Sequence, residues 1–144
     1  MSKLCPSAQP GMDACRVLGV MQQEGPTPLL QYLNETVPAT PEVLAMAAPL
    51  KATEVFRLAA TCAEHHCPHF DGTDCRLATR VVQILPAAVE ALPPCIIRKE
   101  CRWYSQEGGV ACQRCPAITT ATYDLSPEVR EVAGVPPVPE SVIR

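Results

Sequence analysis

The sequence predicts a single, mainly α-helical domain in which short helices are joined by cysteine-bearing loops. Three observations lead to this fold class. Apolar residues recur at helical spacing, several apolar stretches begin with a Thr-Pro or Ser-Pro pair, and no stretch alternates clearly between apolar and polar residues. With 144 residues, 47% of them hydrophobic, the chain has the size of one domain and can bury a core.

Three helices are predicted from a hydroxyl residue followed by proline. Such a hydroxyl residue caps the helix, and proline suits the first helical position because the N–H that it lacks has no partner there. This pattern predicts helices over residues 27–33, 40–48 and 126–134.

Two further helices are predicted from apolar spacing. Residues 51–66 form an amphipathic pattern, and residues 75–85 form a second one that Asp74 can cap. Pro86 is expected to kink this helix or to restart it over residues 87–94.

The C-terminal part of the chain has a different character. Residues 118–125, rich in Thr, are the nearest approach to a strand, and the prolines of residues 135–144 exclude a regular helix. We therefore divide the chain into a cysteine-rich domain, residues 1–125, and a short helix with a Pro-rich tail, residues 126–144.

Charge and hydropathy exclude several classes of protein. A net charge of −3 and the absence of a Lys or Arg block argue against nucleic-acid binding. No apolar run has the length of a membrane span or of a secretory signal, so we expect a cytoplasmic protein without a membrane anchor.

The most unusual feature is a set of nine cysteines, for which disulfides, zinc and iron–sulfur clusters are competing explanations. Thiols stay reduced in the cytoplasm, and an odd number of cysteines does not pair completely, so disulfides are disfavoured. Zinc requires four ligands, usually as two closely spaced pairs, and Cys112 with Cys115 and Cys62 with Cys67 could supply them. The other cysteine spacings are not typical of zinc, and one such site would leave five cysteines unused. Zinc in a structural adaptor protein without redox chemistry is the alternative that we retain.

The irregular cysteine spacing favours iron–sulfur clusters, because loops can approach the irons of a cluster from several directions. We predict one [4Fe–4S] site, and consider a second. The first site comprises Cys95, Cys101, Cys112 and Cys115. The second comprises Cys62, Cys67 and Cys75, completed by Cys15 or Cys5.

Neighbouring residues support the cluster interpretation. Cys5, Cys67 and Cys115 precede proline, as the last cysteine of the bacterial ferredoxin run does, although the compact spacing of that run is absent. An arginine follows Cys15, Cys75 and Cys101 and could offset the negative charge of a cluster with four thiolates.

Other candidate groups receive simpler interpretations. His65 and His66 beside Cys67 could bind a metal, but we interpret them as a polar helix end. No nucleophile elbow, phosphate loop or carboxylate pair is recognisable, and no small-molecule substrate is indicated. We therefore expect a non-catalytic iron–sulfur protein that acts with a redox protein partner, in electron transfer or as a redox accessory or sensor subunit.

Overall fold

The structure, a computed structural model, describes residues 3–22 and 29–118. The prediction of a mainly α-helical fold is wrong, because the chain forms a mixed α/β fold around a four-stranded antiparallel sheet of order β1-β4-β2-β3. The strands are β1 (Leu4–Cys5), β2 (Arg16–Gln22), β3 (Leu29–Pro38) and β4 (Phe56–Thr61). The helices are α1 (Pro41–Ala45), α2 (Ala52–Val55), α3 (Arg76–Ile84), α4 (Arg102–Glu107) and α5 (Gly109–Arg114). Short 3₁₀ turns η1 (Glu64–His66), η2 (Arg98–Glu100) and η3 (Cys115–Ala117) join them.

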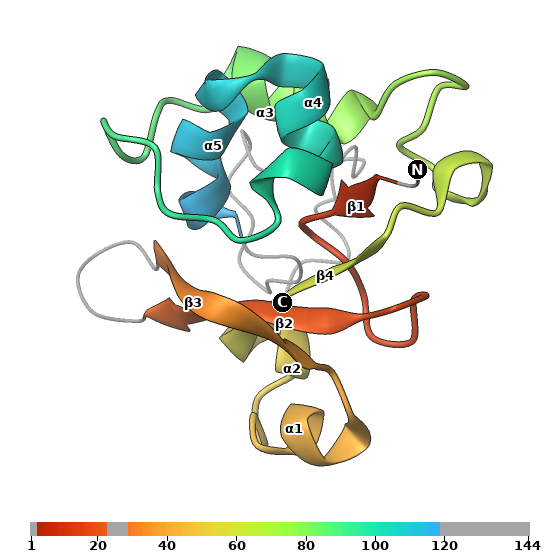
Figure 1. The fold of residues 1–144 in the computed structure, drawn as a ribbon, viewed down its shortest axis with the longest axis vertical. Helices are drawn as coiled ribbons and strands as arrows, with labels where there is room; N and C mark the ends of the chain where they lie inside the picture. Colours follow the sequence, from red (N-terminus) through yellow and green to blue (C-terminus); the bar gives the residue numbers. More distant parts are fainter. Residues whose placement is uncertain (1–2, 23–28, 119–144) are drawn as a thin grey trace, which may run out of the picture.

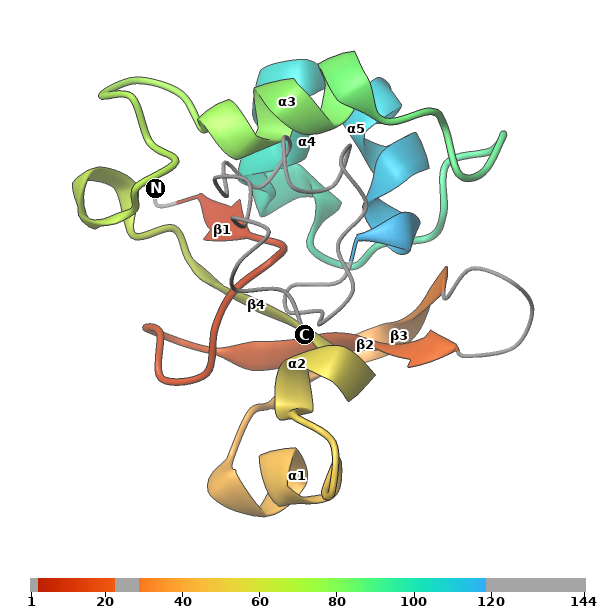
Figure 2. The same ribbon diagram turned by 180° about the vertical axis from the view of Figure 1, so that it is seen from behind.

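The sheet separates two layers of helices. Figures 1 and 2 show α3, α4 and α5 on one side of the sheet and α1 and α2 on the other. Each side has its own core. Leu18, Val81 and Trp103 belong to the core beneath α3–α5, whereas Val17 and Leu58 belong to the core beside α1 and α2.

In β4 the alternating pattern is absent because both faces of the strand are buried. Phe56 to Ala60 are all buried, and Arg57 is the one charged residue among them. Strand β3 is mostly exposed or half-buried, and its sequence does not alternate either. The helix predicted over residues 51–66 is therefore wrong beyond the short α2. The helix predicted over residues 27–33 is also wrong, because this part of the chain enters β3.

Two helix predictions are confirmed. Thr40 caps α1, where its hydroxyl accepts a hydrogen bond from the Val43 N–H at 3.2 Å. Helix α3 forms as predicted and ends before Pro86, but Cys75 rather than Asp74 takes the N-cap position. The stretch between Cys101 and Cys115, for which no helix was predicted, forms α4 and α5.

Several predictions lie outside the described residues. They are the helix over residues 126–134, nearly all of the strand candidate at 118–125, the tail and the domain boundary at residue 125. None of the helices within residues 3–22 and 29–118 has the length and apolar character needed to cross a bilayer.

Candidate metal centre

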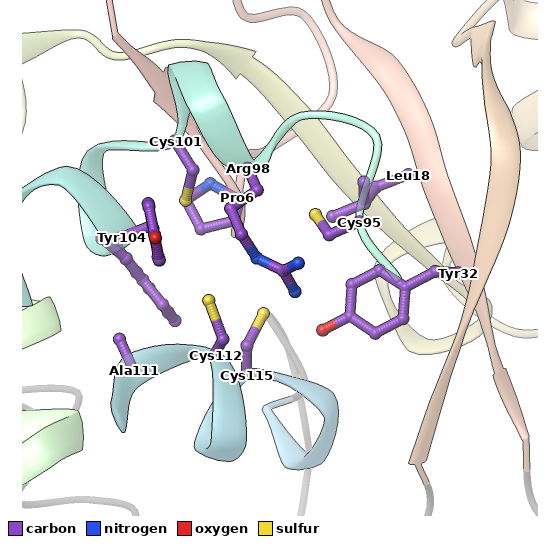
Figure 3. A pocket seen from close by; sticks show the side chains of 11 residues that line it. Pro6, Leu18, Tyr32, Cys95, Arg98, Cys101, Tyr104, Ala111, Cys112 and Cys115 are labelled. Carbon is purple, nitrogen blue, oxygen red and sulfur yellow. The ribbon is translucent and has the colours of Figure 1, made fainter. Parts of the chain in front are cut away.

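Four of the predicted ligands line a single pocket. Cys95, Cys101, Cys112 and Cys115 surround a space of about 330 Å³, part of it open to solvent (Figure 3). Cys95 and Cys101 flank η2, Cys112 lies in α5, and Cys115 begins η3. We call these four residues the first thiol group. The run of four short elements η2, α4, α5 and η3 thus brings together cysteines that are up to twenty positions apart.

The walls of this pocket are largely apolar. They include Pro6, Leu18 and Ala111 and the aromatic side chains of Tyr32, Trp103 and Tyr104. Trp103 and Ala111 are almost fully buried. A dry wall of this kind lowers the local dielectric and keeps water from a bound group.

Burial makes the free thiols of this group hard to ionise. It raises the pKa of Cys101 to about 12, and the nearby Cys115 and Cys95 thiols add to the rise. Burial also raises the pKa of Cys95. Thiolate is the form that binds metal, so a bound metal must displace protons from these thiols.

A buried arginine from the sheet reaches the first thiol group. Arg57 in β4 is fully buried and uses its five N–H donors inside the protein. Two go to the Pro6 carbonyl at 3.0 and 2.7 Å, and two go to the carbonyls of Cys115 and Ile118 at 2.7 and 2.9 Å. The fifth goes to the Cys115 Sγ at 3.1 Å.

The partners of Arg57 include one group that can become an anion, the Cys115 thiol. Burial opposes the charged guanidinium, but Cys115, Tyr32 and Cys5 raise the pKa of Arg57 above its usual value. An unpaired buried cation costs several kcal/mol, of the order of 3–5 kcal/mol where a buried pair is broken. The fold therefore places a buried positive charge in hydrogen-bonding contact with the sulfur of a predicted ligand, Cys115.

A second guanidinium lies among the thiols. Figure 3 shows the Arg98 side chain extending into the space between Cys95, Cys112 and Cys101. Although burial opposes its charge, a hydrogen bond with Cys112 and the charges of Cys112 and Cys95 raise the pKa of Arg98. Another of its N–H groups donates to the Pro93 carbonyl.

Arg98 also leaves a donor unused. Its Nε is buried and has no hydrogen-bond partner among the described residues. A buried donor without an acceptor is costly, and an anionic group in this pocket would satisfy it. Four thiols, two guanidinium groups and a dry wall suit a cofactor that carries net negative charge, such as a [4Fe–4S] cluster with its four thiolates.

Four other cysteines lie near one another at the edge of the sheet. Cys5 ends β1, Cys62 follows β4, and Cys67 and Cys75 lie in the loop between β4 and α3. We call Cys5, Cys62, Cys67 and Cys75 the second thiol group. Of the two candidates for its fourth member, the structure brings Cys5 and not Cys15 to this place.

Cys15 lies apart from both groups. It packs against the core beside α1 and α2, and its thiol lies 3.7 Å from the Gln9 carbonyl, to which it donates. Burial raises the pKa of this thiol. Of the nine cysteines, Cys15 is thus the one that belongs to neither group of four.

The histidines do not join the thiols. His65 and His66 form part of the exposed turn η1, and the His65 ring packs edge-on against Phe70 at 5.2 Å between centroids. The His69 Nδ1 lies 2.9 Å from an Arg80 Nη, and burial together with that cation lowers the pKa of His69.

The arginines predicted to offset cluster charge have different roles. Arg16 donates to the Ala14 carbonyl at 3.2 Å, and exposed Arg76 lies 4.0 Å from Asp71. Arg102 does reach a thiol, the Cys62 Sγ at 3.1 Å, although it follows Cys101 of the other group.

Sequence reasoning missed Arg57, Arg98 and Tyr32. A signal for Arg57 was present, because it is a lone charge inside the apolar run Val55–Ala60 and must be buried with partners if that run is a core strand. Arg98 and Tyr32 carry no such signal, since an arginine in a polar turn and a tyrosine in a strand are ordinary.

Comparisons with protein-family models, with curated proteins and with solved structures find no match for this chain. Within residues 3–22 and 29–118, no three or more His, Cys, Asp or Glu side chains are arranged to hold a metal ion. The thiols of the first group instead line a pocket.

Proposed function

We propose that this chain is a small cytoplasmic iron–sulfur protein that holds a [4Fe–4S] cluster through Cys95, Cys101, Cys112 and Cys115 and transfers electrons to or from a redox protein partner. The observation that carries the proposal is the convergence of these four thiols on one apolar pocket. A sensor or accessory subunit would use the same site.

The arrangement of the thiols favours a cluster over a zinc ion. Zinc draws four thiolates to about 2.3 Å from a single point. A cubane cluster instead binds each thiolate through a separate iron, so its ligands are spread around a volume. The first thiol group is closer to the second arrangement, because Cys95 and Cys101 lie across the pocket from the neighbouring Cys112 and Cys115 (Figure 3).

The charges near the pocket support the same choice. A cubane with four thiolates carries a charge of roughly −2, and the desolvated guanidinium groups of Arg57 and Arg98 oppose it. The Arg98 Nε, buried without a partner among the described residues, would gain an acceptor.

The chemistry requires no substrate. A bound cluster would supply one-electron transfer between a donor and an acceptor protein, which needs no covalent bond to be made or broken at this chain. The residues act by ligation, by excluding water and by setting the potential through charge and hydrogen bonds to sulfur. Partners would approach near Cys95 and Cys112, which are half-buried. Exposed apolar side chains lie close to both in the sequence, Ile96 directly after Cys95 and Val110 two residues before Cys112.

Anaerobic reconstitution of the full chain with iron and sulfide tests the proposal. We expect broad visible absorption near roughly 400 nm that bleaches on reduction, with iron and sulfide in equal amounts. Cys112→Ala should lose the iron of this site, whereas Cys15→Ala, a change at a thiol outside both groups, should retain it. Colourless protein that takes up about one zinc per chain and no iron would replace this proposal with a structural zinc protein.

A further inference from the structure

We propose that Cys5, Cys62, Cys67 and Cys75 form a second [4Fe–4S] site and that Cys15 belongs to neither site. This inference rests on the proposed function for the identity of the cofactor. The choice of ligands comes from the fold.

The pairing of β1 with β4 brings the first two ligands together. Cys5 pairs with Ala60, and the Cys62 N–H donates to the Lys3 carbonyl at 2.9 Å, which continues the ladder by one residue. Alternate residues of a strand share a face, so Cys5 and Cys62 are diagonal neighbours on one face. They are 57 positions apart in the sequence, and a two-residue strand joins them.

The loop after β4 folds back and adds the other two ligands. The Phe70 N–H donates to the Cys67 carbonyl at 3.1 Å, and Phe70 forms an antiparallel bridge with Cys75. The loop therefore returns the chain to the neighbourhood of Cys67 before α3 begins.

A glutamine from α4 fixes the position of Cys75. The Cys75 N–H donates to the Gln106 Oε1 at 2.7 Å, and the Gln106 Nε2 donates to the Cys75 carbonyl at 2.8 Å. Both backbone groups of the proposed ligand are thus held by one side chain, which positions the ligand in advance of binding.

The four thiols also act on one another electrostatically. Burial is the main reason that the pKa of Cys5 is raised to about 12, and Cys75, Cys62 and Cys67 contribute to this rise. Burial raises the pKa of Cys75 as well, with added contributions from Cys67 and Cys62. Every member of the second thiol group is therefore within electrostatic reach of others in the group.

A cation accompanies this group as Arg57 and Arg98 accompany the first. The Arg102 Nε lies 3.1 Å from the Cys62 Sγ, and its guanidinium is held by Glu64 at 2.9 Å and stacks over the Phe70 ring at 5.1 Å. Three contacts fix this guanidinium beside a proposed ligand sulfur.

The two sites would be neighbours. Leu4 pairs with Thr61 on one side and forms a parallel bridge with Cys101 on the other, so β1 lies between the two thiol groups. Arg57 likewise connects the Pro6 carbonyl, next to Cys5, with the Cys115 Sγ.

Iron and sulfide content of the reconstituted full-length chain tests the second site. We expect about eight irons per chain, falling to about four in Cys67→Ala and, separately, to about four in Cys112→Ala. Cys67 suits the test because it lies in a half-buried loop, where its removal threatens folding least. Cys15→Ala is the matched control and should retain about eight irons.

The outcomes separate this inference from the proposed function. About four irons that Cys112→Ala removes and Cys67→Ala leaves in place would overturn the second site alone. About four irons that Cys67→Ala removes and Cys112→Ala leaves in place would support the second site and overturn the first. A chain that takes up no iron would overturn both.

Alkylation of single thiols provides a measurement that needs no variant. Cys15, Cys62 and Cys67 are all half-buried and free of disulfides, so without metal each should react with iodoacetamide. In the loaded protein we expect Cys15 to remain reactive and Cys62 and Cys67 to become protected. Continued reaction of Cys62 and Cys67 in protein that holds iron would contradict the inference.

Discussion

The first thiol group lines a pocket among buried side chains, whereas the second is bordered by the exposed turn η1 and the loop that follows it. Trp103 and Ala111 close off the first group, and Cys101 and Cys115 are themselves buried. In the second group only Cys75 is buried, and Glu64, His65 and His66 beside it are exposed. Since burial and hydrogen bonds to sulfur set the potential and the accessibility of a cluster, one chain would contain a protected site and an accessible one.

The largest effect is expected at Arg57, which donates to Cys115 of the first thiol group and to the Pro6 carbonyl, next to Cys5 of the second. Arg57→Met should lower the free energy of unfolding by several kcal/mol, because the carbonyls of Pro6, Cys115 and Ile118 lose their donors, at about 1–3 kcal/mol for each buried group left unsatisfied. Iron content should fall at both sites. Urea unfolding and iron analysis measure these effects.

Arg57→Lys is the control for charge. Lysine keeps the positive charge but has three donors on one nitrogen instead of five in a planar fork, so an intermediate loss is expected. An unfolding midpoint and an iron content equal to wild type in Arg57→Met would show that this buried cation does not connect the two groups.

Alkaline pH should destabilise the metal-free protein through both groups. Burial raises the pKa of Cys5 and of Cys101 from 9.0 to about 12 in the folded state. The unfolded chain therefore loses these protons first, and stability is complete below about pH 9 and falls as the pH rises toward 12.

The expected slope for each such thiol is about 1.4 kcal/mol per pH unit within this window. Thermal unfolding between pH 8 and 11 measures it. Cys101→Ala should reduce the slope, whereas a slope equal to that of the wild type in this variant would contradict the assignment.

The difference in exposure should appear as two rates of iron loss. With a chelator under air, we expect the second thiol group to release its iron several-fold faster than the first, because water and chelator reach it through the exposed turn at residues 64–66. The time course of visible absorption should have two phases. Cys67→Ala should retain only the slow phase and Cys112→Ala only the fast one. Identical rates in the two variants would show that the two sites do not differ in accessibility.

What the sequence predicted well was local. Cys95, Cys101, Cys112 and Cys115 could be grouped because they lie within one short stretch, and the structure gathers them around one pocket. Their role as ligands stays a prediction. Helix α3 was also predictable, because its apolar spacing and Pro86 are signals within the element itself.

What the sequence could not predict depends on contacts between distant segments. The choice between Cys5 and Cys15 is made by the pairing of β1 with β4, and a two-residue strand has no pattern of its own. Strand β4 was missed because burial on both faces removes the alternation that reveals a strand. Arg102 shows the same limit, since it follows Cys101 in the sequence and contacts Cys62 in space.

The smallest effect is expected at Arg102, and it should be confined to the second thiol group. A charge-assisted hydrogen bond from the Arg102 Nε to the Cys62 Sγ favours the more negative, reduced form, so Arg102→Met should lower the reduction potential of the second site. We expect a shift of about 60 mV, the equivalent of a tenfold change in a one-electron equilibrium. A potentiometric titration in a Cys112→Ala background isolates this site.

Arg76→Met is the control, because Arg76 also follows a cysteine but is exposed and lies 4.0 Å from Asp71, so its removal should leave the potential nearly unchanged. Equal shifts in the two variants would mean that net charge, and not the contact with Cys62, sets the potential of the second site.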